Sequence, residues 1–301
     1  MYLERKAICM SKEKRNKNEP FFIDNYRAMV SLGPLADNAY CRYRCAFCYV
    51  QDEFMSYAKL DIPDIMDFLV KNRAKYNIIY ISGDTDSFAS PRTQVGINLI
   101  QNIVRAVNCD ITFTTRSIFS EHEYEKISEI IKEHKKSGHK FIAGTSITRY
   151  SEDTAYLEPL PIPSPDERIQ HIKRMKKAGA ITLLGLRPFL PVVNKEDYIT
   201  ILDKVYPDLD IALGESFYFI RNGNIQNRVF PNGISDDIEK NIIHNQYMEF
   251  DNNQALWDIW NSEEYENYVA EHCKKLGIIF AMHSKDALEE YNKLCLKKLS
   301  L

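Results

Sequence analysis

The sequence predicts an α/β fold built on a mostly parallel sheet. Short apolar, β-branched runs alternate with longer amphipathic segments along most of the 301 residues. The run Ile78-Ile79-Tyr80-Ile81 is apolar at every position, as expected of a strand that helices cover on both faces. A chain of this length commonly forms a single α/β barrel. Repeated strand–helix units with right-handed crossovers therefore predict an open or closed α/β barrel.

The apolar runs and amphipathic segments predict seven strands and seven helices. The expected strands are 28–35, 77–82, 110–115, 140–147, 181–188, 210–219 and 278–282. The expected helices are 61–75, 92–107, 120–137, 165–178, 195–205, 254–276 and 284–298. Helix starts combine a capping residue with an early proline, as in Asp61-Ile62-Pro63 and Ser164-Pro165. Lysines followed by glycine mark a helix end at Lys176-Lys177-Ala178-Gly179.

Composition along the chain predicts three parts. Residues 1–26 include a charged, breaker-rich stretch and are expected to form a flexible lead-in. Residues 27–219 carry the regular alternation and are expected to form the barrel. Residues 220–301 are expected to be an extension that completes or covers it, because 220–252 is rich in Asn, Asp and Gly and breaks the alternation.

Charge and cysteine usage restrict the class of protein. The net charge is −3, with 39 basic and 42 acidic residues, so no global positive field favours nucleic acid, although a local basic groove stays open. No apolar run approaches the ~20 residues of a membrane span, and the N-terminus does not resemble a signal peptide. Seven cysteines, three of them clustered, do not form a secreted disulfide pattern. We therefore expect a cytoplasmic protein with no membrane attachment.

Three of the cysteines, Cys41, Cys45 and Cys48, lie within eight residues. Three thiolates on one loop can bind three corners of a [4Fe–4S] cluster and leave the fourth iron without a protein ligand. An open coordination position is typical of a catalytic metal site rather than a structural one. A zinc site is the alternative, but zinc needs a fourth ligand nearby, and the next cysteine and histidine along the chain are Cys109 and His122.

The CxxxCxxC spacing, with Phe47 directly before the last cysteine, resembles the signature of the radical S-adenosylmethionine (radical SAM) superfamily. The resemblance implies a partial (β/α)6 barrel, with the cysteine loop after the first strand, followed by a C-terminal extension of mixed helices and strand. It also implies an enzyme in which SAM chelates the open iron through its amino and carboxylate groups. Reductive cleavage of SAM then generates a 5′-deoxyadenosyl radical that abstracts hydrogen from a substrate.

Residues at the ends of the expected strands are candidate SAM contacts, because ligands of such folds lie at the C-terminal ends of the strands. The candidates are Phe47, Ser82, Gly83, Asp84, Thr85, Arg116, Ser146, Thr148 and Arg187. The segment 82–85 stands where superfamily members contact the SAM ammonium group. Arg116 can hold the SAM carboxylate through two parallel hydrogen bonds. The alternative roles are loop capping for the segment 82–85, a surface cation for Arg116 and ordinary packing for Phe47.

The hydroxyls of Ser146 and Thr148 suit the ribose or the carboxylate, Arg187 suits the adenosine or the substrate, and Phe47 suits the adenine.

Several further segments resemble the spore photoproduct lyase-like branch of the superfamily. They are Cys48-Tyr49, Thr145-Ser146-Ile147-Thr148, Leu157-Glu158-Pro159, Ser164-Pro165-Asp166-Glu167-Arg168-Ile169 and Arg187-Pro188-Phe189-Leu190-Pro191. Lesion-repairing members of this branch carry a hydrogen-relaying cysteine at the end of the second strand, where this chain has Gly83-Asp84-Thr85. The resemblance favours a nucleobase or nucleotide substrate but not repair through the same relay.

Substrate and partners stay open at this stage. The resemblance implies an electron donor such as flavodoxin or ferredoxin and a small-molecule, nucleotide or peptide substrate. Aromatic and basic residues of the C-terminal part are candidate substrate contacts: Tyr218, Arg221, Arg228, Tyr247 and Trp257. A peptide-modifying enzyme is one alternative function. A redox or regulatory module without SAM chemistry is another, and it requires a fourth cluster ligand such as Cys273 or His283.

Overall fold

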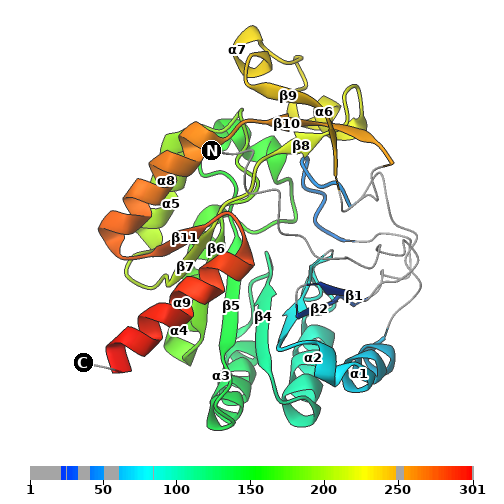
Figure 1. Cartoon of the computed structure of the whole chain (residues 1–301), viewed down its shortest axis with the longest axis vertical. Helices are drawn as coiled ribbons and strands as arrows, with labels where there is room; N and C mark the ends of the chain where they lie inside the picture. The colour runs from blue at the N-terminus through cyan, green and yellow to red at the C-terminus, as the bar shows by residue number, and fades with distance from the viewer. Residues whose placement is uncertain are drawn as a thin grey trace.

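The computed structural model describes residues 22–24, 26–32, 41–50, 61–83, 85–248 and 254–299. Its framework is an eight-stranded sheet of order β1-β2-β3-β4-β5-β6-β7-β11 (Figure 1). The strands are β1 (Phe22–Asp24), β2 (Arg27–Val30), β3 (Ile78–Ile81), β4 (Asp110–Thr114), β5 (Phe141–Ser146), β6 (Ile181–Gly185), β7 (Ile211–Leu213) and β11 (Ile279–Ala281). Only β1 is antiparallel to its neighbour; the other seven strands run parallel.

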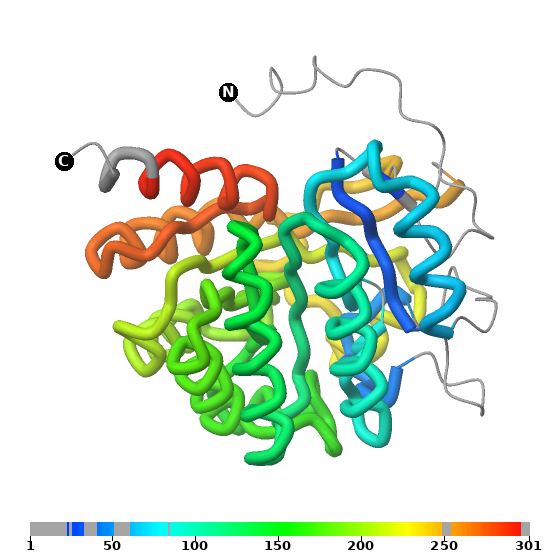
Figure 2. The backbone as a smooth tube through the Cα atoms, turned by 90° about the horizontal axis from the view of Figure 1, so that it is seen from below, coloured from blue at the N-terminus to red at the C-terminus, as the bar shows by residue number. Residues whose placement is uncertain are grey.

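Helices link successive parallel strands, and they lie along an arc when the molecule is viewed from below (Figure 2). They are α1 (Ile62–Lys71), α2 (Thr93–Ala106), α3 (Glu121–Lys136), α4 (Pro165–Ala178), α5 (Lys195–Val205), α8 (Glu263–Leu276) and α9 (Ser284–Leu299), with short 3-10 turns at Arg73–Lys75 and Glu152–Leu157. Capping boxes start α1 at Asp61, α3 at Ser120 and α4 at Ser164. Gly179 ends α4 in the left-handed conformation that glycine adopts without strain. The local signals in the sequence thus fix where these helices begin and end.

A second, antiparallel sheet has the order β8-β10-β9. Its strands are β8 (Tyr218–Phe219), β9 (Ile242–Tyr247) and β10 (Leu256–Trp260), and the short helices α6 (Asn224–Val229) and α7 (Asp236–Glu239) lie between β8 and β9 in the chain. In Figure 1 this sheet lies at the top of the molecule, over the end at which residues 41–50 run. The segment after residue 219 therefore contributes two strands of the second sheet, β9 and β10, and, through β11, a further strand of the main sheet.

The expected α/β fold class and partial barrel are confirmed. Six of the seven expected strands are present as single strands, and β11 makes the parallel part of the sheet one strand larger than the six of the expected (β/α)6 unit. The first strand is observed as Arg27–Val30, and residues 33–35 of the expected strand lie outside the described ranges, as does most of the expected lead-in 1–26. None of the helices in the described ranges is both long and apolar enough for a membrane span.

Two predicted elements are wrong. The expected helix 254–276 is in fact strand β10 followed by helix α8, because Leu256–Trp260 pairs with both β8 and β9. The expected strand 210–219 is divided into β7 and β8, which belong to different sheets. In both cases the correct element depends on pairing with residues distant in the sequence.

Candidate active site

The cluster loop, which we define as residues 41–50, lies between β2 and α1 in the chain and is held by its backbone. The Ala46 N–H donates to the Leu157 carbonyl at 2.9 Å. Arg228 of α6 donates from Nε to the Ala46 carbonyl at 2.9 Å and from Nη2 to the Cys48 carbonyl at 3.3 Å. The Tyr43 hydroxyl lies 2.7 Å from the Ser117 hydroxyl. Contacts from three distant parts of the chain thus set the loop conformation.

The three cysteines of the loop open onto one cavity of about 300 Å³. The other described residues around this cavity come from strand ends, from the cluster loop and from β8: Arg27, Met29, Tyr43, Phe47, Tyr49, Val50, Tyr80, Ser82, Gly83, Thr85, Asp86, Thr114, Thr115, Arg116, Ser146, Arg187, Pro188, Glu215, Phe217, Tyr218 and Ser284. Most of the strand-end residues follow the C-terminal ends of β3, β4, β5 and β6, where α/β folds bind their ligands.

Cys45 is buried, Cys41 and Cys48 are partly exposed, and none of the three forms a disulfide. Burial, followed by the charge of Asp86, raises the pKa of Cys41 to about 11. Burial raises the pKa of Cys45 to about 12. A thiol binds metal as the thiolate, so metal binding at this loop releases protons.

The donor set fits an iron–sulfur cluster better than a single metal ion. Among the described residues, no three His, Cys, Asp or Glu side chains are grouped so that they could hold one ion. A cubic cluster binds its thiolates through different iron atoms, so Cys41, Cys45 and Cys48 need not converge on one point. Around the cavity, the described lining contains no cysteine or histidine besides these three.

Seven of the predicted SAM contacts lie on the wall of this same cavity: Phe47, Ser82, Gly83, Thr85, Arg116, Ser146 and Arg187. Thr148 is not on the wall; it is fully buried and donates to Glu158 Oε1 at 2.9 Å. Asp84 lies outside the described residues. The structure thus gathers most of the predicted contacts beside the three cysteines.

Asp86 is a site residue that the sequence interpretation missed. Its carboxylate accepts hydrogen bonds from the Thr115 hydroxyl at 2.8 Å, from the Arg116 backbone N–H at 2.7 Å and from the Phe88 backbone N–H at 3.0 Å. Burial raises the pKa of Asp86, and these donors oppose that shift. The carboxylate joins the loop after β3 to the end of β4 and so fixes the backbone of Arg116.

Aromatic and charged residues form another part of the wall. Arg187 donates to the Tyr80 hydroxyl at 2.5 Å, and the Tyr218 hydroxyl donates to Glu215 at 3.2 Å. The Tyr49 and Tyr218 rings lie 5.7 Å apart. Tyr80 stands inside strand β3, whose four residues are all buried, so sequence periodicity gave no sign of which face it occupies.

Of the candidate substrate contacts, only Tyr218 lines the cavity. Arg228 holds the cluster loop, and Arg221 pairs with Asp258 and Glu239. Trp257 is fully buried, and Tyr247 is 64% exposed. The candidate fourth ligands Cys273 and His283 are not part of the described lining.

Comparison with protein families matches residues 38–205, more than half of the chain, to the Radical SAM superfamily. The chain therefore belongs to the radical SAM superfamily, whose members are enzymes that use a [4Fe–4S] cluster and SAM. A search of curated proteins gave no match.

Solved structures agree with this assignment at the level of the fold. A double mutant of spore photoproduct lyase with bound AdoMet and dinucleoside spore photoproduct is 14% identical, with 85% of this chain and 82% of that chain covered and a TM-score of 0.61. The radical SAM methyltransferase TsrM from Kitasatospora setae, with tryptophan and the SAM analogue aza-SAM bound, is 11% identical, with 87% of this chain and 61% of that chain covered and a TM-score of 0.54. At these identities the similarity shows a shared fold.

Proposed function

We propose that Cys41, Cys45 and Cys48 bind a [4Fe–4S] cluster and that SAM binds in the adjoining cavity. The observation that carries this proposal is that the three cysteines and seven independently predicted SAM contacts line one cavity. When bound, the cluster supplies an electron for the reductive cleavage of SAM to a 5′-deoxyadenosyl radical, which abstracts hydrogen from a substrate. The protein's part is to orient SAM, to hold the substrate and to exclude water.

The residues of the wall have distinct roles in this proposal. Arg116 binds the SAM carboxylate, because a guanidinium matches a carboxylate with two parallel donors. Ser82, Gly83 and Thr85 receive the SAM ammonium group through their backbone and hydroxyl oxygens. Ser146 contacts the ribose or the carboxylate. Thr148 is occupied with Glu158 behind the wall, so we assign it no direct contact.

Phe47 contacts the adenine, and Arg187 contacts the adenosine or the substrate. Asp84 keeps its predicted role toward the ammonium group from outside the described residues.

For the substrate we propose a planar aromatic group, with a nucleobase or nucleotide favoured. Tyr49, Phe217 and Tyr218 bring aromatic rings to the wall, and aromatic side chains stack on bases. The spore photoproduct lyase structure holds a dinucleoside, which supports this choice. Apart from the three cysteines of the cluster loop, the described lining has no thiol, so we do not propose hydrogen relay through a cysteine.

A peptide substrate is the alternative for the same chemistry. A redox module without SAM chemistry is less well supported, because the described lining offers the cluster no fourth cysteine or histidine. We further propose a cytoplasmic location and an electron donor such as flavodoxin or ferredoxin, since the cluster needs a reducing environment and a source of single electrons.

The proposal is tested by anaerobic reconstitution with iron and sulfide, followed by chromatography for 5′-deoxyadenosine after reduction. We expect about four irons per chain and SAM cleavage in the wild type. Cys45→Ser should abolish both, whereas Cys295→Ser, which changes a cysteine outside the cavity, should retain both. A fully reduced wild-type cluster that never cleaves SAM, with or without nucleotide substrates, would contradict the proposal.

A further inference from the structure

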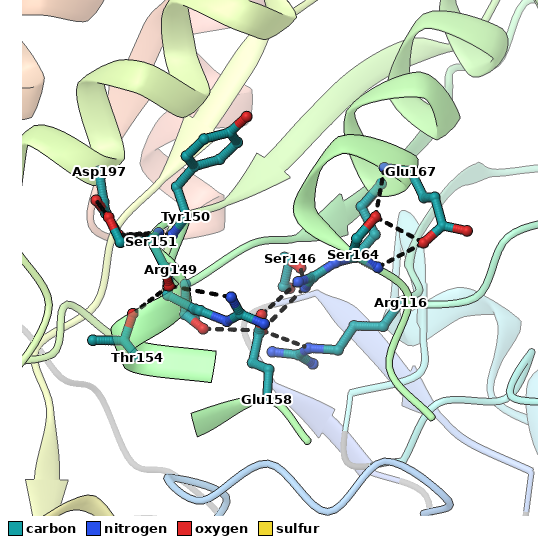
Figure 3. Close-up of polar contacts among 12 residues, drawn as sticks. Arg116, Ser146, Arg149, Tyr150, Ser151, Thr154, Glu158, Ser164, Glu167 and Asp197 are labelled. Atoms are coloured by element: carbon teal, nitrogen blue, oxygen red, sulfur yellow. Dashed lines mark hydrogen bonds and ion pairs between the residues drawn. The ribbon is translucent and has the colours of Figure 1, made fainter. Parts of the chain in front are cut away.

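A buried ion pair joins Glu158 to Arg168. Figure 3 shows Glu158 beside Arg116 and Ser146, two residues of the cavity wall. Arg168 of α4 donates from Nη1 to Glu158 Oε1 at 3.0 Å and from Nη2 to Glu158 Oε2 at 2.5 Å. Both side chains have no exposed surface. Arg168 also donates to the Ser146 carbonyl at 2.5 Å, at the end of β5. This two-point contact fixes the orientation of the Glu158 carboxylate.

The same carboxylate holds Arg116. The Arg116 Nε donates to Glu158 Oε1 at 3.3 Å, and the guanidinium carbon lies 5.7 Å from the centre of the Phe47 ring. Asp86 binds the Arg116 backbone. Within the described ranges, the two terminal nitrogens of Arg116 have no hydrogen-bond partner, although the residue lines the cavity.

Glu158, with one negative charge, faces two guanidinium groups, those of Arg168 and Arg116. Asp86 also acts on Arg116 through its charge, but its carboxylate accepts from the Arg116 backbone N–H and the Thr115 hydroxyl rather than from the guanidinium. Burial would raise the pKa of Glu158, but Arg168, Arg116 and the Thr148 hydroxyl lower it to about 2, so the carboxylate is ionised at neutral pH. Arg168 makes a two-point contact with Glu158, which meets Arg116 through Nε, so the terminal part of the Arg116 guanidinium is left to the cavity that the residue lines. A buried or half-buried cation of this kind calls for an anionic partner.

The segment that holds Arg116 also holds the cluster loop. The Leu157 carbonyl accepts from the Ala46 N–H, and Glu158 is the next residue along the chain. Leu157 and Glu158 therefore fix the distance between the cysteines and the guanidinium of Arg116. The sequence motif Leu157-Glu158-Pro159 therefore connects the cluster loop to Arg116.

We propose that Glu158, oriented by Arg168, is a positioning residue that directs the terminal nitrogens of Arg116 at the carboxylate of SAM bound beside the cluster loop. This inference rests on the proposed function. Glu158 itself touches no ligand; it acts through Arg116 alone.

The test measures SAM affinity of the reconstituted holoenzyme for the wild type, Arg116→Gln, Glu158→Gln and the double variant. A hydrogen bond to a charged group is worth about 10- to 100-fold in affinity, so Arg116→Gln should weaken SAM binding by that factor. Glu158→Gln should weaken it by roughly tenfold. The double variant should bind no more weakly than Arg116→Gln, because a positioning residue has no effect once its target is gone.

Two further variants separate positioning from a general structural effect. Glu239→Gln removes a carboxylate from the Arg221 ion pairs, away from the described lining of the cavity, and should leave SAM affinity unchanged. Arg116→Lys keeps the positive charge and the buried Glu158–Arg168 pair but lacks both the Nε donor and the two parallel terminal donors, so it should weaken SAM binding at least as much as Glu158→Gln. Iron content should equal that of the wild type in every variant.

Decarboxylated SAM provides a readout specific to the carboxylate. The wild-type holoenzyme should bind SAM more tightly than decarboxylated SAM. The ratio of these two affinities should be smaller in both Arg116→Gln and Glu158→Gln. Provided that the wild type cleaves SAM, either of two results would overturn the inference. One is that Arg116→Lys binds SAM as tightly as the wild type. The other is that the losses of SAM affinity in Arg116→Gln and Glu158→Gln add in the double variant. Failure of the wild type to bind or cleave SAM would instead overturn the proposed function.

Discussion

At the scale of single residues, Arg228 connects the small antiparallel sheet region to the cluster loop. It reaches from α6 to the carbonyls of Ala46 and Cys48, which stand on either side of Phe47. A loop that presents three thiolates must keep its backbone fixed while the cluster is inserted and reduced. Hydrogen bonds from a guanidinium to backbone carbonyls supply that restraint.

Replacing Arg228 by Gln should therefore loosen the loop and speed the loss of iron. We expect the half-time of cluster loss to a chelator to shorten about tenfold or more, because one lost hydrogen bond to a charged group is worth about 10- to 100-fold. The exposed neighbour Asn227→Ala serves as the control and should behave like the wild type. An unchanged rate of iron loss in Arg228→Gln would show that the loop does not depend on this contact.

His171 makes the stability of the fold depend on pH. It is fully buried on α4, and its Nδ1 lies 2.7 Å from the Tyr124 hydroxyl. Burial, assisted by the charge of Arg174, lowers the pKa of His171 from 6.5 to about 3. Between these two values the unfolded chain binds a proton that the folded chain does not, so the free energy of unfolding falls as the pH falls below 6.5.

We expect His171 alone to remove about 1 kcal/mol of stability between about pH 7.5 and about pH 5.5. Urea unfolding of the wild type and His171→Gln at both pH values measures this difference. The variant should be less stable than the wild type at the higher pH, because it loses the contact with Tyr124, but it should show a smaller acid-side decrease. The same acid-side decrease in both proteins would rule out His171 as its source.

At the scale of elements, one glycine sets the spacing of two central strands. Gly144 of β5 lies opposite Leu183 of β6, and its carbonyl accepts from the Thr115 N–H. A Cβ at this position would overlap the backbone carbonyl of Leu183. Because backbone cannot rotate away as a side chain can, strands β5 and β6, which present Ser146 and Arg187, would have to separate.

Gly144→Ala should therefore destabilise the protein by several kcal/mol or prevent folding. Gly138→Ala is the matched control: its φ of +81° makes alanine unfavourable, but nothing lies within 4 Å of the added Cβ. We expect that control to cost about 1–2 kcal/mol. Thermal unfolding compares the two, and equal decreases in melting temperature would show that β5 and β6 tolerate the larger side chain.

The sequence predicted those elements whose signals are local. Helices α3 and α4 were predicted within one residue because capping residues and glycine stand at their ends. Strand β10 was missed because its central residue, Asp258, is unusual in a buried strand. The structure explains it: Asp258 accepts from Arg221 at 2.6 Å, and Arg221 lies 37 residues away in the chain. Such a pairing has no local signature.

The residues of the candidate site also fall into those that the sequence could predict and those that it could not. Phe47 and Arg116 could be predicted because they follow a motif or a strand end. Tyr80 and Asp86 could not, since neither periodicity nor a motif indicates which side chains of a buried strand or a polar loop face the cavity. Glu158 was noticed only as part of a resemblance, and its contact with Arg116 became visible from the fold.

At the scale of the whole molecule, segments that are distant in the chain line the cavity together. Its described wall includes Arg27 from β2, Arg187 after β6 and Tyr218 of β8. Arg27 donates at 2.9 Å to the hydroxyl of Ser284, the first residue of α9, which follows β11 in the chain. This hydrogen bond joins the two ends of the parallel sheet, β2 and β11, across the opening that an incomplete barrel leaves. The cavity is thus partly closed although the sheet on which it lies is open.

We propose that this cavity provides both a place for a cluster with one open iron and room beside it for SAM. This combination is the central claim, since each separate feature has an alternative role. An enzyme of this kind needs SAM to be in contact with the iron, whereas a redox module does not.

The most direct measurement is magnetic resonance of the reduced holoenzyme with SAM whose amino nitrogen carries the ¹⁵N label. We predict a hyperfine coupling between that nitrogen and the cluster, present in the wild type and lost when Cys48→Ser prevents cluster assembly. A reduced, fully loaded cluster whose spectrum is unchanged by SAM and shows no coupling to the label would contradict the account.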